Sequence, residues 1–526
     1  MFTRLRTLRR ATVTLAASAI AAACLTAPAH AQSSTPDALI SDPADPFYAA
    51  PAEVPQAPGT VIREQLAPHM LNLADPTARQ LGLDEPQLPG RAHRMMYSST
   101  DRDGRPVAVT GVVIEPSVPW TGAGPTPTLV MAAGTRGQGD ACAPSKGPWL
   151  LGAIDPQHGA AGINYELPAM YAAAMRGMRV VMTDYMGLGT EGLHHYVHRT
   201  KQAHAVLDSA RAGLALAGAP ADSPVAFYGY SQGGGAAAAA AEEAAGYAPG
   251  LNVAGSYVGA PPAELTSVLG GVDGSTIAGV LGYAVNTGRD IAPAVDEAFD
   301  RQAAPQASAK LRRLADACIG DTALSWAFRS SAELIESGRP LSEVLEEEPA
   351  IREYLSEQAL GLHPISAPML VLSGRHDDVI PHAQARGMAV GYCAAGGTVD
   401  FRSDGLPELP HKTGLNHAIP VFSHAGPALD WVQDRFNGVP AASNCDALLA
   451  GGPEQVLGVP GVSSERVPGL AGRPRVGKMC RFVGALQRFP RSIFGGGDKG
   501  AHFARAQARE GAISSSGRGS SGHRAA

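Results

Sequence analysis

Short apolar runs alternate along the chain with segments of helical length. Because the runs are short and rich in large apolar residues, they predict strands. Six runs follow this rhythm: residues 128–133, 178–183, 225–228, 253–258, 369–372 and 398–401. Strands that alternate with helices are typical of a mostly parallel sheet with helices on both faces, so the pattern predicts an α/β fold.

Two runs before this pattern, residues 94–98 and 106–115, flank the turn signal Asp103-Gly104 and predict a β-hairpin. Residues 32–66 are rich in Pro, Ala and Asp, so we expect an extended arm that lies over the domain and is not a core element.

A long insertion interrupts the strand rhythm at residues 265–364. It contains helix-like stretches at 308–317 and 332–348, so it predicts a helical cap on a core formed by residues 67–264 and 365–446. Long excursions from a compact fold often serve as lids.

Both ends of the chain differ from this body. Four arginines precede an apolar run that ends in Ala29-His30-Ala31, which predicts a signal peptide over residues 1–31 and a mature chain from Gln32. A lipid anchor on Cys24 is disfavoured, because Ala21-Ala22-Ala23 lacks the larger aliphatic residue that is usual three positions before a lipidated cysteine. Residues 447–526 are rich in Gly, Ser and Arg and lack periodicity, so we expect a disordered basic tail.

Composition narrows the class of protein. The chain is 45% hydrophobic and 17% charged, as a globular protein is, and no stretch after the signal is long enough to span a membrane as a helix. The formal net charge is −6 although the tail is basic, so the body is acidic and repels nucleic-acid phosphates. We expect a secreted or periplasmic protein without a nucleic-acid partner.

Four cysteines in the body make an even set that suits an oxidising compartment: Cys142, Cys318, Cys393 and Cys445. The sequence leaves all three ways of pairing them open. The other two cysteines lie outside the body, Cys24 in the predicted signal peptide and Cys480 in the tail.

The sharpest chemical signal is Gly229-Tyr230-Ser231-Gln232-Gly233, which follows one predicted strand and precedes a Gly/Ala-rich helix. A serine between glycines at a strand-to-helix turn is typical of a nucleophile whose hydroxyl is presented above a sheet. The backbone N–H of Gln232, at the helix N-terminus, can stabilise an oxyanion on the attacked carbonyl.

Such a serine needs a base and an orienting acid, which in this architecture follow it in the order acid, then histidine. Asp377, after the strand at 369–372, is the predicted acid, and Asp378 is its competitor. His417, in a loop after the next strand, is the predicted base. His411 and His424 are expected to be surface or packing residues.

A second oxyanion donor is expected from the glycine-containing loop after the strand at 128–133, with Thr135 and Gly137 as candidates. A plain surface turn is the alternative for this loop.

Four histidines cluster at His194, His195, His198 and His204, but no His-Glu-x-x-His motif accompanies them. We expect a polar loop and helix start here, with no metal ion. Asp184 to Gly189 lacks the pattern of a dinucleotide-binding loop, so no cofactor is expected.

The chain resembles the secretory lipase family, the group of fungal lipase A type enzymes and their secreted bacterial relatives. The resemblance covers residues 45–445. The motifs that carry it are Asp45-Pro46-Phe47-Tyr48, Pro58 to Arg63, Gly134 to Gly137, Cys142-Ala143-Pro144-Ser145, Asp184-Tyr185, Gly187-Leu188-Gly189, Gly229 to Gly233, Gly374 to Pro381, Trp431, Asp434-Arg435-Phe436 and Cys445.

The resemblance implies an α/β-hydrolase fold with an inserted cap, hydrolysis of carboxylic esters of lipids, and disulfides joining Cys142 to Cys318 and Cys393 to Cys445. We therefore predict a serine lipase or carboxylesterase that contacts lipid interfaces transiently. A serine aminopeptidase or amidase on the same fold is one alternative. A non-catalytic envelope-binding protein is the other.

Overall fold

The computed structural model describes residues 45–67, 89–147, 152–155, 160–452 and 455–457. The predicted signal peptide, Cys24, residues 32–44 of the arm, Cys480 and most of the tail lie outside the described residues. Within the described part of the chain, no helix is long and apolar enough to cross a membrane.

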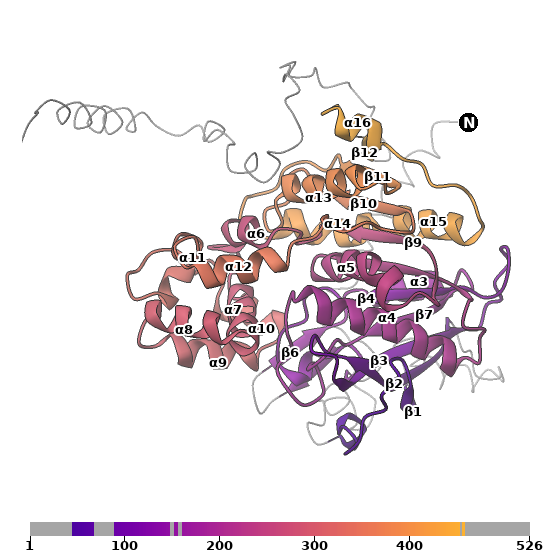
Figure 1. The fold of residues 1–526 in the computed structure, drawn as a ribbon, viewed down its shortest axis with the longest axis horizontal. Coiled ribbons are helices and arrows are strands. Elements are labelled where there is room, and N and C mark those ends of the chain that lie inside the picture. Colours follow the sequence, from indigo (N-terminus) through magenta and orange to yellow (C-terminus); the bar gives the residue numbers. More distant parts are fainter. Residues whose placement is uncertain (1–44, 68–88, 148–151, 156–159, 453–454, 458–526) are drawn as a thin grey trace, which may run out of the picture. The chain divides into compact units, whose positions relative to one another are not determined.

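One sheet of ten strands organises the described residues (Figure 1). The first three strands along the chain pair antiparallel at one edge, the other seven run parallel to one another, and the pairing is antiparallel where the two sets meet. In spatial order the strands are β1 (Val61–Leu66), β2 (Gly90–Thr100), β3 (Pro106–Pro116), β7 (Arg179–Thr183), β4 (Thr128–Ala132), β8 (Pro224–Tyr230), β9 (Asn252–Gly259), β10 (Met369–Ser373), β11 (Val399–Asp404) and β12 (Gln455–Leu457). The α/β fold predicted from the apolar runs is confirmed.

Helices cover this sheet. Helices α4 (Arg199–Leu216) and α5 (Gln232–Tyr247) pack against each other and against the central strands. The other sheet-associated elements are α3 (Leu167–Ala174), α13 (His382–Ala394), α14 (Leu415–Ser423), α15 (Ala425–Phe436) and α16 (Cys445–Leu449), while β5 (Gly152–Asp155) and β6 (Ala160–Ile163) form a separate small hairpin.

The segment between β9 and β10 folds into a set of short helices, which Figure 1 shows gathered beside the sheet. They are α6 (Leu265–Val272), α7 (Val280–Ile291), α8 (Pro293–Gln302), α9 (Ala307–Ala315), α10 (Ile319–Ser325), η6 (Ser331–Leu334), α11 (Leu341–Leu345) and α12 (Pro349–Glu357). We refer to residues 265–364 as the cap. Its buried apolar side chains, which include Tyr283, Phe299 and Leu311, form a cluster separate from the main core of the sheet and shared with a few residues outside the cap.

The single helix expected at 332–348 is wrong. Gly338 has a left-handed φ of 69°, and Pro340 precedes the first turn of α11, so the chain turns between two short helices.

Two expected boundaries are also corrected. The end of the predicted arm belongs to the sheet, because β1 pairs with β2 as the edge strand. The start of the described arm is also anchored, since the buried Phe47 and Tyr48 pack against Met96. The tail does not begin at residue 447, since α16 extends to Leu449 with Leu448 buried, and β12 adds a strand beside β11. The residues of β1 are half-exposed and form no apolar run, and α16 and β12 are too short to show a periodic pattern.

The two disulfides join Cys142 to Cys318 and Cys393 to Cys445, as the resemblance implies. The first ties the cap to the loop after β4 and closes a loop with a sequence separation of 176 residues. The second ties α13 to α16 across a separation of 52 residues.

Removing the cap disulfide in a Cys142→Ala/Cys318→Ala variant is expected to lower the free energy of unfolding by about 2–5 kcal/mol, because the unfolded chain loses a long cross-linked loop. The Cys393→Ala/Cys445→Ala variant serves as the control, and its loss should be smaller by about 1 kcal/mol, since its loop is shorter. Urea unfolding of both variants measures the difference. A larger loss in the control would contradict the expectation.

Candidate active site

Ser231 lies at the sharp turn between β8 and α5. Its φ of 58° and ψ of −124° place a non-glycine residue in a strained region of backbone space, and its N–H donates to the Gly259 carbonyl at 2.9 Å. A Cβ atom on Gly229 would lie 1.9 Å from the Gly233 carbonyl oxygen, and one on Gly233 would lie 2.1 Å from the Ala132 carbonyl oxygen. Both glycines are therefore required for the turn to close.

His417 meets Ser231 from the other side. Its Nε2 atom lies 2.9 Å from Ser231 Oγ. The structure corrects its expected setting, because His417 lies in the first turn of α14 and not in a loop. The Tyr230 hydroxyl donates to the backbone carbonyl of His417 at 2.9 Å, so the residue before the serine helps to hold the histidine.

Asp377 lies behind the histidine. Its Oδ2 atom is 2.8 Å from His417 Nδ1, and its Oδ1 atom accepts from the backbone N–H groups of Val379 and Ile380 at 3.0 and 2.8 Å. Its side chain is fully buried. A carboxylate accepts from Nδ1–H, which leaves Nε2 free to take a proton from the Ser231 hydroxyl.

The competing residues have other partners. Asp378 is buried and accepts from the Gly414 N–H at 3.0 Å, just before α14 begins, so it anchors the helix that carries His417. His411 is exposed. His424 is buried, and its Nε2 atom lies 3.2 Å from Asp404 at the end of β11, an acid–histidine pair that the sequence did not suggest.

The loop after β4 lies against the serine turn. A Cβ atom on Gly134 would lie 3.2 Å from the Tyr230 carbonyl oxygen, and the Gly134 N–H donates to Glu166 at 2.7 Å. Two tyrosines donate to carbonyl oxygens of this loop, Tyr185 to Ala133 at 2.7 Å and Tyr165 to Thr135 at 3.2 Å. These contacts fix the backbone of the loop.

The backbone N–H groups of Gln232 and Thr135 have no hydrogen-bond acceptor among the described residues. Gln232 directly follows Ser231, and Thr135 directly follows Gly134, which lies against the Ser231 turn. The third candidate donor, Gly137, is packed against the cap. A Cβ atom on it would lie 2.5 Å from the Cα atom of Cys318 and 2.7 Å from Cys142 Sγ, so this glycine makes room for the disulfide.

Charge is buried beside this loop. Arg136 forms an ion pair with Glu166, and both side chains are almost fully buried. Burial raises the pKa of Glu166, and the Arg136 guanidinium opposes this shift. The pair is one contact that sequence reasoning missed, because residues 136 and 166 carry no local motif that links them.

The four clustered histidines have separate partners. His195 pairs with Asp290 at 2.8 Å, His204 stacks on Tyr247 with ring centroids 3.7 Å apart, and His198 caps the N-terminus of α4. His194 contacts Gln232. Among the described residues, no group of three or more His, Cys, Asp or Glu side chains could hold a metal ion.

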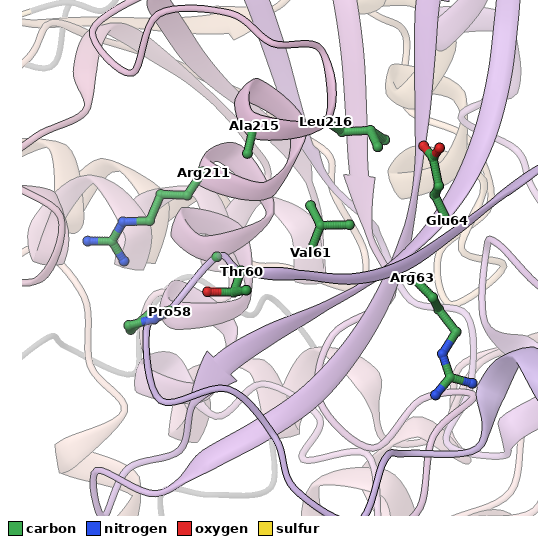
Figure 2. A pocket seen from close by; sticks show the side chains of 9 residues that line it. Pro58, Thr60, Val61, Arg63, Glu64, Arg211, Ala215 and Leu216 are labelled. Atoms are coloured by element: carbon green, nitrogen blue, oxygen red, sulfur yellow. The ribbon is translucent and has the colours of Figure 1, made fainter.

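A surface hollow of about 780 Å³ lies elsewhere, between the edge strand β1 and helix α4 (Figure 2). Val61, Arg63 and Glu64 line it from β1, and Arg211 and Ala215 line it from α4. None of Ser231, Asp377 and His417 contributes to its lining, so this hollow is separate from the candidate active site.

A family model described as secretory lipase matches residues 156–444, which is more than half of the chain. The chain belongs to the secretory lipase family. It is a hydrolase of the lipase and esterase type, with the α/β-hydrolase fold that the resemblance implies.

Similar proteins share most of the chain's length. Lipase A of Arthroderma benhamiae is 25% identical over 418 residues, which are 78% of this chain and 82% of the relative. A probable inactive lipase of Mycobacterium tuberculosis is 27% identical, over 75% of this chain and 82% of the relative. The crystal structure of Candida antarctica lipase A in its closed state superposes with a TM-score of 0.64 at 21% identity, covering 80% of this chain and 91% of that one. This last likeness concerns the fold.

The two adjacent aspartates can be distinguished by substitution. An Asp377→Asn variant is expected to lower kcat for ester hydrolysis about a thousandfold or more, because an amide can hold the imidazole in the wrong tautomer. Asp378→Asn removes a negative charge but keeps an oxygen that can accept from the Gly414 N–H, so kcat should fall by less than about tenfold. Steady-state kinetics with a soluble p-nitrophenyl ester measure both. The reverse order of effects would assign the acid to Asp378.

Proposed function

We propose that the chain is a secreted carboxylic ester hydrolase that cleaves acylglycerols through an acyl-enzyme formed on Ser231. The observation that carries the proposal is the chain of short contacts from Ser231 Oγ to His417 to Asp377, at 2.9 and 2.8 Å. The three residues come from distant parts of the sequence, and the contacts order them as nucleophile, base and orienting acid.

In the first half of the reaction, Ser231 Oγ attacks the ester carbonyl carbon while His417 Nε2 takes the hydroxyl proton. The negative charge that develops on the carbonyl oxygen is stabilised by the free N–H groups of Gln232 and Thr135. The tetrahedral intermediate then collapses, the C–O bond to the alcohol breaks, and His417 gives its proton to the departing alcohol oxygen.

In the second half, water attacks the acyl-enzyme and His417 takes its proton. The new intermediate releases the carboxylic acid and regenerates Ser231 with the proton from His417. Asp377 stays ionised throughout, holds Nδ1–H, and stabilises the imidazolium that forms transiently. These steps use only residues of the chain, and we propose no metal ion or organic cofactor.

The cap offers an apolar wall for an acyl chain. Its buried cluster includes Tyr230, Val379 and Ile380, which are neighbours in sequence of Ser231 and Asp377. The apolar cluster of the cap therefore includes side chains that lie close in sequence to Ser231 and to Asp377. We propose that residues 265–364 form the lid or tunnel that receives the acyl group.

Secretion is part of the proposal. The arginine-led apolar segment over residues 1–31 has the features of a signal peptide, and two disulfides suit an oxidising compartment outside the cytosol. The destination is the extracellular medium or the periplasm.

Hydrolysis of p-nitrophenyl esters from acetate to palmitate by the mature protein, beside Ser231→Ala, tests the nucleophile. We expect kcat to fall by about three orders of magnitude or more in the variant, because the covalent route is lost. A preference for long acyl chains supports a lipase, and a preference for acetate a carboxylesterase. Turnover of amino-acid anilides alone would favour the peptidase, and no turnover by folded wild-type protein would favour the binding protein.

Contact with a lipid interface is proposed for the exposed side of α14. This helix carries His417 on its buried side and exposes Leu415, Ile419 and Phe422, which are 46%, 40% and 59% exposed. Spacings of four and three residues place these side chains on one face, and the helix contains no charged residue. An aggregated lipid ester is the partner that such a face beside the proposed triad fits.

An Ile419→Ser/Phe422→Ser variant is expected to lose about fivefold or more of its activity on emulsified triacylglycerol, because less apolar area is buried on adsorption. Its activity on dissolved p-nitrophenyl acetate should stay within about twofold of wild type. Leu66→Ser on β1, where the side chain is 63% exposed, is the matched control. Equal losses on both substrates would contradict an interfacial role.

A further inference from the structure

The segment from His194 to Val197 lies between β7 and α4 and contacts the proposed active site at two points. His194 is buried, and its Nδ1 atom lies 3.2 Å from the Met186 carbonyl oxygen, which can only accept. The proton is therefore on Nδ1, and Nε2 is an acceptor. The Gln232 side-chain Nε2 donates to it at 3.0 Å.

The surroundings keep His194 neutral and in place. Burial lowers the pKa of His194 to about 4, so the acceptor on Nε2 persists at neutral pH. Its ring stacks on Tyr185 with centroids 5.6 Å apart, and its backbone carbonyl accepts from Gln138 Nε2 at 2.8 Å.

The second contact is made two residues later. The Tyr196 hydroxyl lies 2.8 Å from Thr135 Oγ1, and Tyr196 packs edge-on against Tyr283 of the cap with centroids 5.6 Å apart. One short segment thus holds the side chains of Gln232 and Thr135, whose backbone N–H groups have no acceptor among the described residues.

The backbone of this segment is itself strained. Val197 has a φ of 54°, which β-branched residues rarely adopt. Strained residues persist where the surrounding contacts over-determine them, and they concentrate at functional sites. The strain at Val197 is therefore offset by the contacts that His194 and Tyr196 make with the residues around Ser231.

We propose that His194 and Tyr196 are positioning residues that aim the oxyanion-binding amides of Gln232 and Thr135, through the side chains of those two residues. The proposal rests on the acyl-enzyme function proposed above. Ser231 combines a φ of 58° with a ψ of −124°, and rotation of the peptide plane between Ser231 and Gln232 would bring that ψ toward the left-handed helical region while turning the Gln232 N–H away from the oxyanion. The hydrogen bond to His194 opposes that rotation from the side chain of Gln232.

Two substitutions at His194 separate positioning from simple packing. Glutamine places a carbonyl oxygen near the position of Nε2 and can still accept from Gln232, while asparagine places an N–H group near Nδ1 and can donate only to Met186. Each variant keeps one of the two hydrogen bonds, so their thermal unfolding temperatures should be similar.

In the full-length chain, we expect His194→Asn to lower kcat by about 10- to 100-fold at unchanged KM, because a donor is misplaced only for the transition state. His194→Gln should keep kcat within about threefold of wild type. The inhibition constant of an alkyl boronic acid, which forms a tetrahedral adduct with serine, should rise in parallel with the loss of kcat. Tyr196→Phe should act in the same direction as His194→Asn.

A double-mutant cycle tests whether His194 acts through the side chain of Gln232. Gln232→Met removes the same hydrogen bond but keeps the backbone N–H, so the His194→Asn/Gln232→Met variant should be no slower than the slower single variant. His204→Asn, which alters a buried histidine on α4 away from Ser231, is the control and should leave kcat unchanged.

The inference is overturned if His194→Asn and His194→Gln lose kcat equally, if the cycle is additive, or if boronate affinity is unaffected. Failure of the proposed function is a separate outcome, because it appears as ester hydrolysis that survives Ser231→Ala or is missing from the wild-type protein.

Discussion

The close approach of α5 to the sheet is the constraint on which the proposed active site depends. At Gly229, Gly233 and Gly234 a single added carbon would collide with backbone atoms at about 2 Å, so no side chain can stand between the helix and β4, β8 and β9. This approach forces the left-handed turn at Ser231 and brings the free N–H of the first helical residue beside its hydroxyl. Neither feature can be kept if the helix moves outward.

Buried tyrosine hydroxyls and one buried ion pair hold the backbone segments around the Ser231 turn in place. Tyr230 holds His417 from the turn itself, Tyr185 and Tyr165 hold the loop that carries Thr135, and Glu166 is shared between Arg136 and the Gly134 N–H. Polar groups in a water-poor interior are costly unless they are paired, so each of these contacts also penalises alternative arrangements. The site is organised before any ligand arrives.

The sequence predicted the parts of this arrangement that have local signatures. The apolar runs identified the strands at the centre of the sheet, and the glycines around Ser231 gave the turn, because both depend on neighbours within a few residues. The order of strands predicts His417 after β11, but it does not predict the helix around it, because Pro420 lies inside α14 and proline usually ends a helix. The contacts of Tyr230 with His417 and of Gln232 with His194 span 187 and 38 residues, so they depend on the tertiary fold and no spacing rule could reveal them. The edge strand β1 was hidden for a different reason, since its half-exposed residues do not form an apolar run.

The chain order of Ser231 and His417 has a consequence for synthesis. The two residues that share a hydrogen bond are 186 positions apart, with the whole cap between them. A ribosome therefore completes the turn of the proposed nucleophile long before it adds the proposed base. A nascent chain or a fragment that stops before α14 has the Ser231 hydroxyl without the imidazole of His417. In the proposed mechanism, chemical competence requires that α14 has been made and has packed against the Ser231 turn.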